Sequence, residues 1–432
     1  GIRDVAPSRG LGDVYKSQAL LADPGNALFH LTDPRGASDK SGRTFNNPYQ
    51  YFFEQMHMDD AIYADESIYE YPMQQGGGND GRPYSFGRPS SGGSKAAYPC
   101  KSYGQGRINP AYFYGVFDPN DMRRDVSITM TGSNGKGVEK LIPFVPNSKA
   151  EGGGLTLNKW DENRQANPWV AAQRKSGING PYMRMSEVYL GYAEVCAALG
   201  DVVTGKQYLK TVRERSFPQG LANTDAFIAS FGNDLVRAII EERGFEYAGE
   251  GDRRWTLIRS GYLPEDIKRI KDMTKAMMDG LATKGYYEFE NGNIISAYIW
   301  TKLVDAKTIY GHRLTAQCPT DKVNDPVLYP GWRGQKDNWE EMGLNYGSST
   351  PATNLAIKGL FEIVSEEEAA SLESQGYTKV NWGIDLVDNR DEYDKYLFWD
   401  YDYVSAPIYL WPFTPNVMAA GGFTNGYGFK QE

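Results

Sequence analysis

Apolar residues recur at spacings of three and four from residue 182 onward, which is the repeat of an α-helix. The residues in this repeat are Met185, Val188, Tyr189, Tyr192, Val195, Cys196 and Leu199. Gly200 can take the left-handed conformation that ends a helix, so the pattern predicts a helix over about 182–199, with Cys196 buried. A second helix is expected at about 204–215, antiparallel to the first because the turn is short. The pair has the size of one tetratricopeptide-like unit.

Further segments downstream of this pair also have helical patterns. The first of them, about 233–248, places apolar residues on one face and charged residues elsewhere. The last begins with Ser365 and acidic residues, which are favoured at a helix N-terminus. The predicted helices are 233–248, 252–259, 265–281, 354–364 and 365–375.

Two parts of the chain lack a helical repeat. Pro and Gly interrupt 1–180 at short intervals, and 285–350 has a similar loop-like composition. The sequence therefore predicts a mainly α protein with long, irregular, loop-rich insertions and a few short strands. We expect one domain, in which 1–180 is loop-rich, 181–260 holds the helix pair and the following helices, and 261–432 is a loop-rich C-terminal region.

The charge balance excludes some classes of partner. The chain has 46 Lys and Arg against 55 Asp and Glu, a net charge of -9, so we expect no nucleic-acid partner. No apolar run reaches the length of about 18 residues that a membrane helix needs, and the first residues do not resemble a signal peptide. If the protein is exported, we expect its signal upstream of Gly1. The cysteines, Cys100, Cys196 and Cys318, are too far apart for a CxxC metal knuckle or a dense disulfide framework.

Catalytic motifs are scarce in this sequence. It contains no Walker loop, HExxH, GxSxG or EF-hand loop, and with three histidines a His-dependent hydrolase is disfavoured. Residues 76–81 match GxGxxG, but Arg82-Pro83 follows where a dinucleotide site requires a helix, which favours a flexible loop. We expect no cofactor and no metal. A two-carboxylate glycosidase stays open, because the separation of its carboxylates cannot be read from a sequence.

Three other groups of residues favour structural interpretations. The charged cluster of 241–254 predicts an ion-pair network that ties the helix at 233–248 to the segment after it. Trp255 is expected in the core, because Leu257 and Ile258 indicate a packed segment. An acidic run after residue 384 favours a solvated loop over a calcium site. Its members are Asp385, Asp388, Asp391, Glu392 and Asp394.

Aromatic residues in the loop-rich regions are the candidates for ligand binding. A sugar has an apolar CH face and a rim of hydroxyls, so an exposed ring offers stacking and nearby polar groups offer hydrogen bonds. The alternative is that these rings pack beneath their own loops, as we expect for more than half of them. The first group comprises Tyr84, Phe86, Tyr98, Tyr103, Tyr112, Phe113, Tyr114 and Trp160. A reserve group, Trp332, Trp339 and Tyr346, lies beside Arg333, Lys336 and Asn338.

Four segments, taken in order, resemble the SusD/RagB family of outer-membrane nutrient-binding lipoproteins. Residues 182–194 (YMRMSEVYLGYAE) are similar to the family's hhRhAEhhLhhAEA segment, where h is apolar. Residues 212–215 (VRER) resemble LNxVRxRAG, and 239–259 resemble IxxERxxEFxxEGxRxxDLxRW. The tail at 408–415 is similar to LxPIPxxE. The sequence departs from the pattern at Ser186, Thr256 and Ser260, where the family has Ala, Asp and Trp respectively. The family's N-terminal lipid-anchor Cys and helical repeats have no counterpart in this sequence.

The resemblance implies a role and a set of site residues. It implies a SusD-like fold, with tetratricopeptide-like pairs on one side and ligand-facing loops on the other. The implied role is non-enzymatic: a lipid-anchored protein of the Gram-negative cell surface captures an oligosaccharide, or an oligopeptide, for a TonB-dependent outer-membrane transporter. A glycosidase, or a lid subunit that mainly contacts the transporter, remains an alternative. The expected ligand-binding residues are Tyr84, Phe86, Tyr98, Tyr103, Tyr114, Trp160, Trp332 and Trp339.

Overall fold

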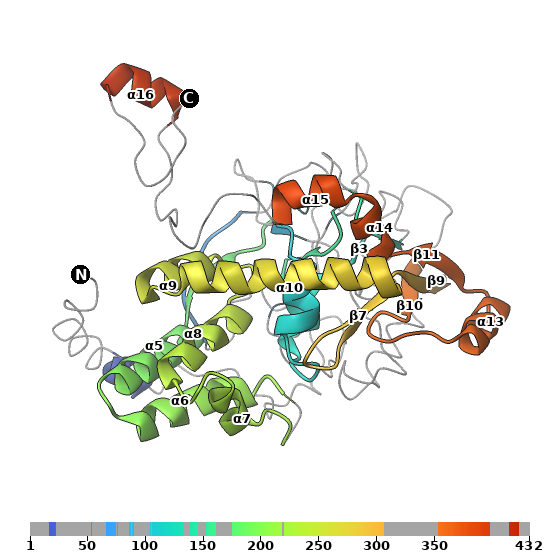
Figure 1. Cartoon of the computed structure of the whole chain (residues 1–432). Helices are drawn as coiled ribbons and strands as arrows, with labels where there is room; N and C mark the ends of the chain where they lie inside the picture. The colour runs from blue at the N-terminus through green and yellow to red at the C-terminus, as the bar shows by residue number, and fades with distance from the viewer. Residues whose placement is uncertain are drawn as a thin grey trace.

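The computed structural model of the protein describes most of the region between residues 104 and 305 and much of the C-terminal part. The described residues are 17–22, 53, 66–74, 76, 86–87, 89, 104, 106–133, 139–145, 153–160, 175–217, 220–305, 353–397 and 414–422. Helices dominate this structure and its strands are short, which confirms the mainly α prediction (Figure 1). In these residues, no helix is both long and apolar enough to cross a membrane.

The helix pair predicted from the apolar repeat is present as α5 (Met185–Ala198) and α6 (Val202–Glu214). Gly200 between them has a φ of 92°, a left-handed conformation that glycine adopts without steric cost. The side chain of Asp201 then caps α6 by accepting a hydrogen bond of 3.1 Å from the backbone N–H of Thr204. The turn folds α6 back against α5, as expected.

A third helix completes the packing of this pair. α7 (Thr224–Ala229), which the sequence did not predict, leads into α8 (Leu235–Glu246), which contacts both α5 and α6. Asp234 caps α8 through the backbone N–H of Arg237 at 3.0 Å. Cys196 is buried, as predicted. The apolar core between the helices includes Met185, Leu190, Ala193, Leu209, Val212, Leu235, Ala238 and Ile239.

Two more predicted helices connect the halves of the molecule. α9 (Asp252–Ser260) is followed by α10 (Leu263–Lys284), whose first turn contains Pro264 and acidic residues. In Figure 1, α10 runs across the molecule, with α5 to α9 toward one end and the C-terminal strands toward the other. The predicted segments at 252–259 and 265–281 are therefore confirmed.

A three-stranded antiparallel sheet corrects two predictions. Its central strand β9 (Tyr298–Asp305) pairs with β10 (Thr353–Lys358) on one side and β11 (Thr378–Asn381) on the other. The predicted helix at 354–364 was wrong, because β9 supplies a ladder partner for 353–358 and the strand then buries Leu355 and Ile357 on one side. The loop-like stretch from residue 285 was also wrong in part, since β9 and a short hairpin lie within it.

The acidic run is helical in the structure. α13 (Glu366–Ser374) begins at Ser365 as predicted, but α14 (Gly383–Asp388) and α15 (Arg390–Leu397) replace the expected solvated loop. The reason is that apolar side chains between the acids are buried and hold both helices against the core. These side chains are Trp382, Leu386 and Tyr393.

The second core lies under the sheet and α10. Its centre is the ring of Tyr114 in η3 (Tyr112–Val116), which stacks on Phe289 at a centroid distance of 6.1 Å. The indole N–H of Trp382 donates a hydrogen bond of 2.8 Å to the Tyr114 hydroxyl oxygen. The remaining short elements are β1 (Ser67–Tyr71), α4 (Arg123–Ser127), β2 (Ile128–Thr129), β3 (Thr131–Ser133), β4 (Glu139–Leu141), β5 (Thr156–Leu157), β6 (Gly180–Arg184), β7 (Tyr286–Glu288), β8 (Ile294–Ser296) and α16 (Pro415–Gly421).

Candidate functional site

The structure gives positions for three of the aromatic residues predicted to bind ligand. Tyr114 and Trp160 are completely buried. Phe86 is 47% exposed, and its ring lies against Gly106. The others lie outside the described residues: Tyr84, Tyr98, Tyr103, Trp332 and Trp339.

The two buried rings act in packing. The hydroxyl of Tyr114 is an acceptor within the core, and its ring also contacts Phe361 at a centroid distance of 5.4 Å. Its neighbour Phe113 stacks on the same Phe361 ring. Neither Tyr114 nor Trp160 presents surface to a ligand in this conformation. Phe86 is therefore the predicted residue whose described position suits stacking.

A cluster of exposed tyrosines that the sequence analysis did not select lies on two paired strands. Tyr69 and Tyr71 of β1 are 57% and 52% exposed, and Tyr182 of β6 is 70% exposed. The strands run antiparallel, and the rings of Tyr69 and Tyr182 meet edge to face, with centroids 5.5 Å apart and planes at 85°. We call these three residues the tyrosine face.

Strand alternation explains why the tyrosines point outward. Tyr69 and Tyr71 are two residues apart and therefore share one side of β1, whereas Ile68 packs against the core of α5, α6 and α8. The register is irregular on both sides of Tyr69, which is opposite Met183. Such a bulge changes the direction of side chains, and both Tyr182 and Met183 are exposed.

A hydrogen bond ties β1 to the residue before β6. Glu70, between the two tyrosines of β1, accepts a hydrogen bond of 2.8 Å from the Asn179 amide through Oε2. The Asn179 carbonyl oxygen in turn accepts one from the backbone N–H of Met73 at 2.8 Å. Strand alternation places Glu70 on the other side of β1 from the two tyrosines, so this contact supports the strand pair and is not part of the tyrosine face.

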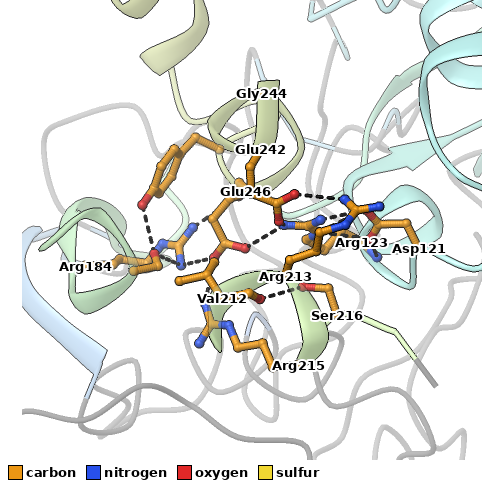
Figure 2. Close-up of polar contacts among 12 residues, drawn as sticks. Asp121, Arg123, Arg184, Val212, Arg213, Arg215, Ser216, Glu242, Gly244 and Glu246 are labelled. Carbon is orange, nitrogen blue, oxygen red and sulfur yellow. Dashed lines mark hydrogen bonds and ion pairs between the residues drawn. The ribbon is translucent and has the colours of Figure 1, made fainter. Parts of the chain in front are cut away.

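Buried ion pairs fix the end of the two strands where β6 runs into α5. Figure 2 shows carboxylates of α8 and arginines from three other segments converging at this point. Arg184, opposite Ser67 in the ladder, contacts Glu66 at 2.7 Å and Glu246 at 2.8 Å through Nη1. Arg215 contacts the same two carboxylates at 2.6 Å and 2.7 Å. The tyrosine face is thus anchored by charges from the residue before β1, from β6, from α8 and from the C-cap of α6.

The network continues beyond these strands. Arg123 contacts Glu242 at 2.6 Å and Glu246 at 3.1 Å, and Arg213 contacts Glu242 at 2.9 Å. Toward α9, Arg253 contacts Glu241 at 2.7 Å. The predicted structural ion-pair network is therefore confirmed, and it reaches further than the sequence indicated.

Two arginines keep the Glu66 carboxylate ionised. Burial raises the pKa of the Glu66 carboxyl, but the guanidinium groups of Arg215 and Arg184 more than offset this and hold the pKa below its ordinary value. Burial lowers the pKa of Arg184, but the carboxylates of Glu250 and Glu246 raise it by more. The pKa of Arg184 therefore lies well above its ordinary value. A general acid needs a carboxyl with a raised pKa, so Glu66 is poorly suited to that role.

Trp255 corrects another prediction. It was expected in the core, but more than half of its side-chain surface is exposed on α9. The buried residues of that helix are Thr256 and Leu257, so the inward face passes through them and Trp255 lies outside it.

Among the described residues, no three His, Cys, Asp or Glu side chains gather where they could hold a metal ion.

Comparisons with known proteins agree with the resemblance seen in the sequence. The profile of the SusD family matches residues 29–412. SusD-like protein P25 of Formosa agariphila is 28% identical over 160 residues, which cover 37% of this chain and 26% of that protein. The crystal structure of a SusD homolog from Bacteroides thetaiotaomicron has a TM-score of 0.44 and 17% identity, with 62% of this chain and 52% of that chain covered.

A second solved structure is that of surface glycan-binding protein A from the same bacterium, in complex with laminarihexaose. Its TM-score is 0.39 at 16% identity, with 61% of this chain and 53% of that chain covered. The chain therefore spans about half the length of these two structures and about a quarter of the Formosa protein.

Proposed function

Because this chain belongs to the SusD family, we propose that it is a cell-surface protein that captures an oligosaccharide by non-covalent binding. In this proposal it passes the bound glycan to a TonB-dependent outer-membrane transporter, and a lipid anchor upstream of Gly1 holds it at the surface. An oligopeptide is the alternative ligand for the same kind of complex.

The tyrosine face is the observation that carries the proposal. Tyr69, Tyr71 and Tyr182 each expose more than half of their surface, and a pyranose ring can stack its CH face on such side chains.

Preorganisation supports the same interpretation. The buried contacts of Arg184 with Glu66 and Glu246 hold the two strands in place before any ligand arrives. Tyrosine has few rotatable bonds, so a fixed strand pair loses little conformational entropy on binding. A rigid aromatic surface of this kind suits repeated capture and release.

Binding without hydrolysis suits the nearby carboxylates. Glu66 and Glu246 are buried and contact arginines, whereas a glycosidase needs a carboxyl pair open to substrate, one of them with a raised pKa. The capture function therefore has the stronger support.

The test is calorimetric titration of the chain with a panel of oligosaccharides that includes laminarihexaose and with oligopeptides of similar length. We expect one glycan class to bind. Tyr182→Ala and Tyr69→Ala should each weaken that binding about tenfold, the range of an aromatic anchor residue. Phe86→Ala tests the predicted residue that is exposed. Trp255→Ala is the matched control, because it removes an exposed ring from α9 and leaves the tyrosine face intact.

The outcomes separate the alternatives. Unchanged binding in both tyrosine variants would show that the ligand does not contact this face. If peptides bind and no glycan does, the ligand of this protein is an oligopeptide. Release of shorter sugars at stoichiometric protein would favour the glycosidase. Co-purification of the native protein with a large β-barrel would test the delivery step.

A further inference from the structure

A second aromatic surface lies on the β9–β11 part of the three-stranded sheet. The register places Lys379 of β11 and Lys358 of β10 opposite Trp300 of β9, and Asn381 opposite Tyr298. Directly opposite residues share one face of an antiparallel sheet, as do residues two apart on a strand. One face therefore carries Tyr298, Trp300, Lys302, Lys358, Lys379 and Asn381, and we call it the basic face.

The two sides of this sheet differ sharply in character. Ile299, Ile357 and Val380 alternate with the basic-face residues and belong to the core beneath the sheet. On the basic face, the side chains of Tyr298, Lys379 and Asn381 are exposed. The sheet thus buries its apolar side and turns Tyr298 and Lys379 outward, whereas Trp300 of the basic face is itself buried.

Two lysines of the basic face, Lys302 and Lys379, lie over aromatic rings. Lys379 Nζ is 4.3 Å from the ring centroid of Tyr298 and 5.8 Å from that of Trp300. Lys302 Nζ is 5.8 Å from the ring centroid of Tyr377 and donates a hydrogen bond of 2.6 Å to the carbonyl oxygen of Gln375. These cation–π contacts hold each ammonium group beside the ring surface.

These two lysines differ from three other surface lysines of this acidic chain. Lys206, Lys210 and Lys268 each pair with a carboxylate. In the described part of the chain, neither Lys302 nor Lys379 forms an ion pair, although the net charge is -9. A surface that keeps two such cations next to rings is complementary to an anionic ligand that also has an apolar face.

We propose that the basic face binds an acidic sugar, that is, a sugar unit bearing a carboxylate or a sulfate. The CH face of one sugar unit would lie on Tyr298, with its anionic group at Lys379 and its hydroxyls at Asn381. Lys302 lies four residues along β9, about 13 Å from Tyr298, and would contact the anionic group of another unit of the same glycan. This inference rests on the proposed glycan capture and adds a second contact surface that selects the charge of the glycan.

The contribution of the two lysines to glycan affinity is expected to be modest, because ion pairs at the surface are exposed to water. An exposed ion pair adds roughly two- to fivefold to affinity, so two of them add about tenfold. The effect should weaken in salt, because the Debye length falls from about 8 Å at physiological ionic strength to about 3 Å at 1 M.

The experiment titrates the full chain with four probes: a galacturonate hexamer, a sulfated galactan hexamer, neutral laminarihexaose and a glutamate hexapeptide. We expect the double variant K302Q/K379Q to lose about tenfold in affinity for the acidic glycans and to bind the neutral one unchanged. Tyr298→Ala should weaken the acidic glycans as well. Lys275→Gln on α10 is the control, since it removes one exposed positive charge far along the sequence from the basic face. Circular dichroism checks the fold of each variant.

Each outcome decides between the inference and the proposed function. Tighter binding of one or both acidic glycans, lost in the double variant, supports the inference, and the two acidic probes distinguish carboxylate from sulfate. If neutral and acidic hexamers bind equally, or if the double variant binds acidic glycans as the wild type does, the inference is overturned and glycan capture stands. If the double variant loses as much affinity for the glutamate hexapeptide as for the acidic glycans, the basic face is a peptide-binding surface and the inference is overturned. If no glycan binds to the wild type, both proposals fail.

Discussion

The buried network behind the tyrosine face and the exposed lysines of the basic face use similar charges in opposite ways. Arg184, Glu246 and their partners are almost wholly buried, and each contacts more than one opposite charge. Lys379 is exposed and lies over a ring, with no carboxylate beside it in the described structure.

The difference teaches that burial decides whether a charge supports the fold or remains available to a ligand. A buried ion loses its hydration and must be matched within the protein, so its removal leaves an uncompensated partner. An exposed ion keeps its water and can exchange part of it for a ligand group at small cost.

The largest expected effect comes from breaking the buried network. Glu246→Ala removes the carboxylate that Arg123, Arg184 and Arg215 share. We expect the free energy of unfolding to fall by about 3–5 kcal/mol, because three guanidinium groups lose a buried partner. Urea denaturation measures it. A loss below about 1 kcal/mol would mean that the remaining carboxylates balance the three arginines. The buried network would then contribute as little to stability as the exposed charges of the basic face.

Acid should weaken the buried region next. Burial raises the pKa of Glu241, but Arg253, Arg269 and Arg237 lower it from 4.5 to about 2. Because the folded-state pKa is depressed, the stabilisation is fully present above pH 4.5 and is lost as the pH falls toward 2. The shift corresponds to about 3 kcal/mol.

The variant Glu241→Gln isolates this contribution. Denaturation curves recorded between pH 5 and pH 2 should fall less steeply for the variant than for the wild type, because the glutamine has no proton to bind. Parallel curves would show that other carboxyl groups cause the acid sensitivity.

A smaller effect on stability, but a clear one on binding, is expected at the tyrosine face. Tyr182→Ala should change the free energy of unfolding by less than about 0.5 kcal/mol, since the ring is 70% exposed. It should nevertheless weaken glycan binding by about 1–2 kcal/mol. Thermal denaturation and calorimetry on the same sample measure the two quantities. Equal losses in both would identify the tyrosine as a structural residue.

The smallest effect is expected for a surface ion pair. Lys268 and Asp272 pair at i and i+4 on α10, and both side chains are well exposed. Lys268→Ala should alter the free energy of unfolding by less than about 0.5 kcal/mol, and 1 M salt should remove that difference. A larger loss would contradict the view that exposed charges here contribute little to the fold.

Local patterns predicted the helices well but failed where partners are distant. The repeat that begins near residue 182 produced α5, and Asp201 and Gly200 marked the turn. The segment at 354–364 was predicted as helix because its apolar residues suit either element, and the deciding partner β9 lies about fifty residues earlier. Trp255 was predicted as buried because a helix face cannot be oriented from a short segment alone.

The candidate sites were the least predictable part. Selecting rings from Gly-rich and Pro-rich loops identified Phe86, but it also identified Tyr114 and Trp160, which pack in the interior. The signal that would have found the tyrosine face was the alternation Tyr69-Glu70-Tyr71, which is the period of a half-exposed strand.

The sequence by itself determined the helix pair, the family resemblance and the presence of a charged cluster, because each depends on neighbours within a few turns or on short motifs. Only the tertiary structure decided which charges are buried and which rings are exposed. Glu66 and Arg215 are 149 residues apart along the chain, yet they meet at 2.6 Å. No local window contains both members of such a pair, so the fold alone makes Arg184 an anchor and leaves Tyr182 open to a ligand.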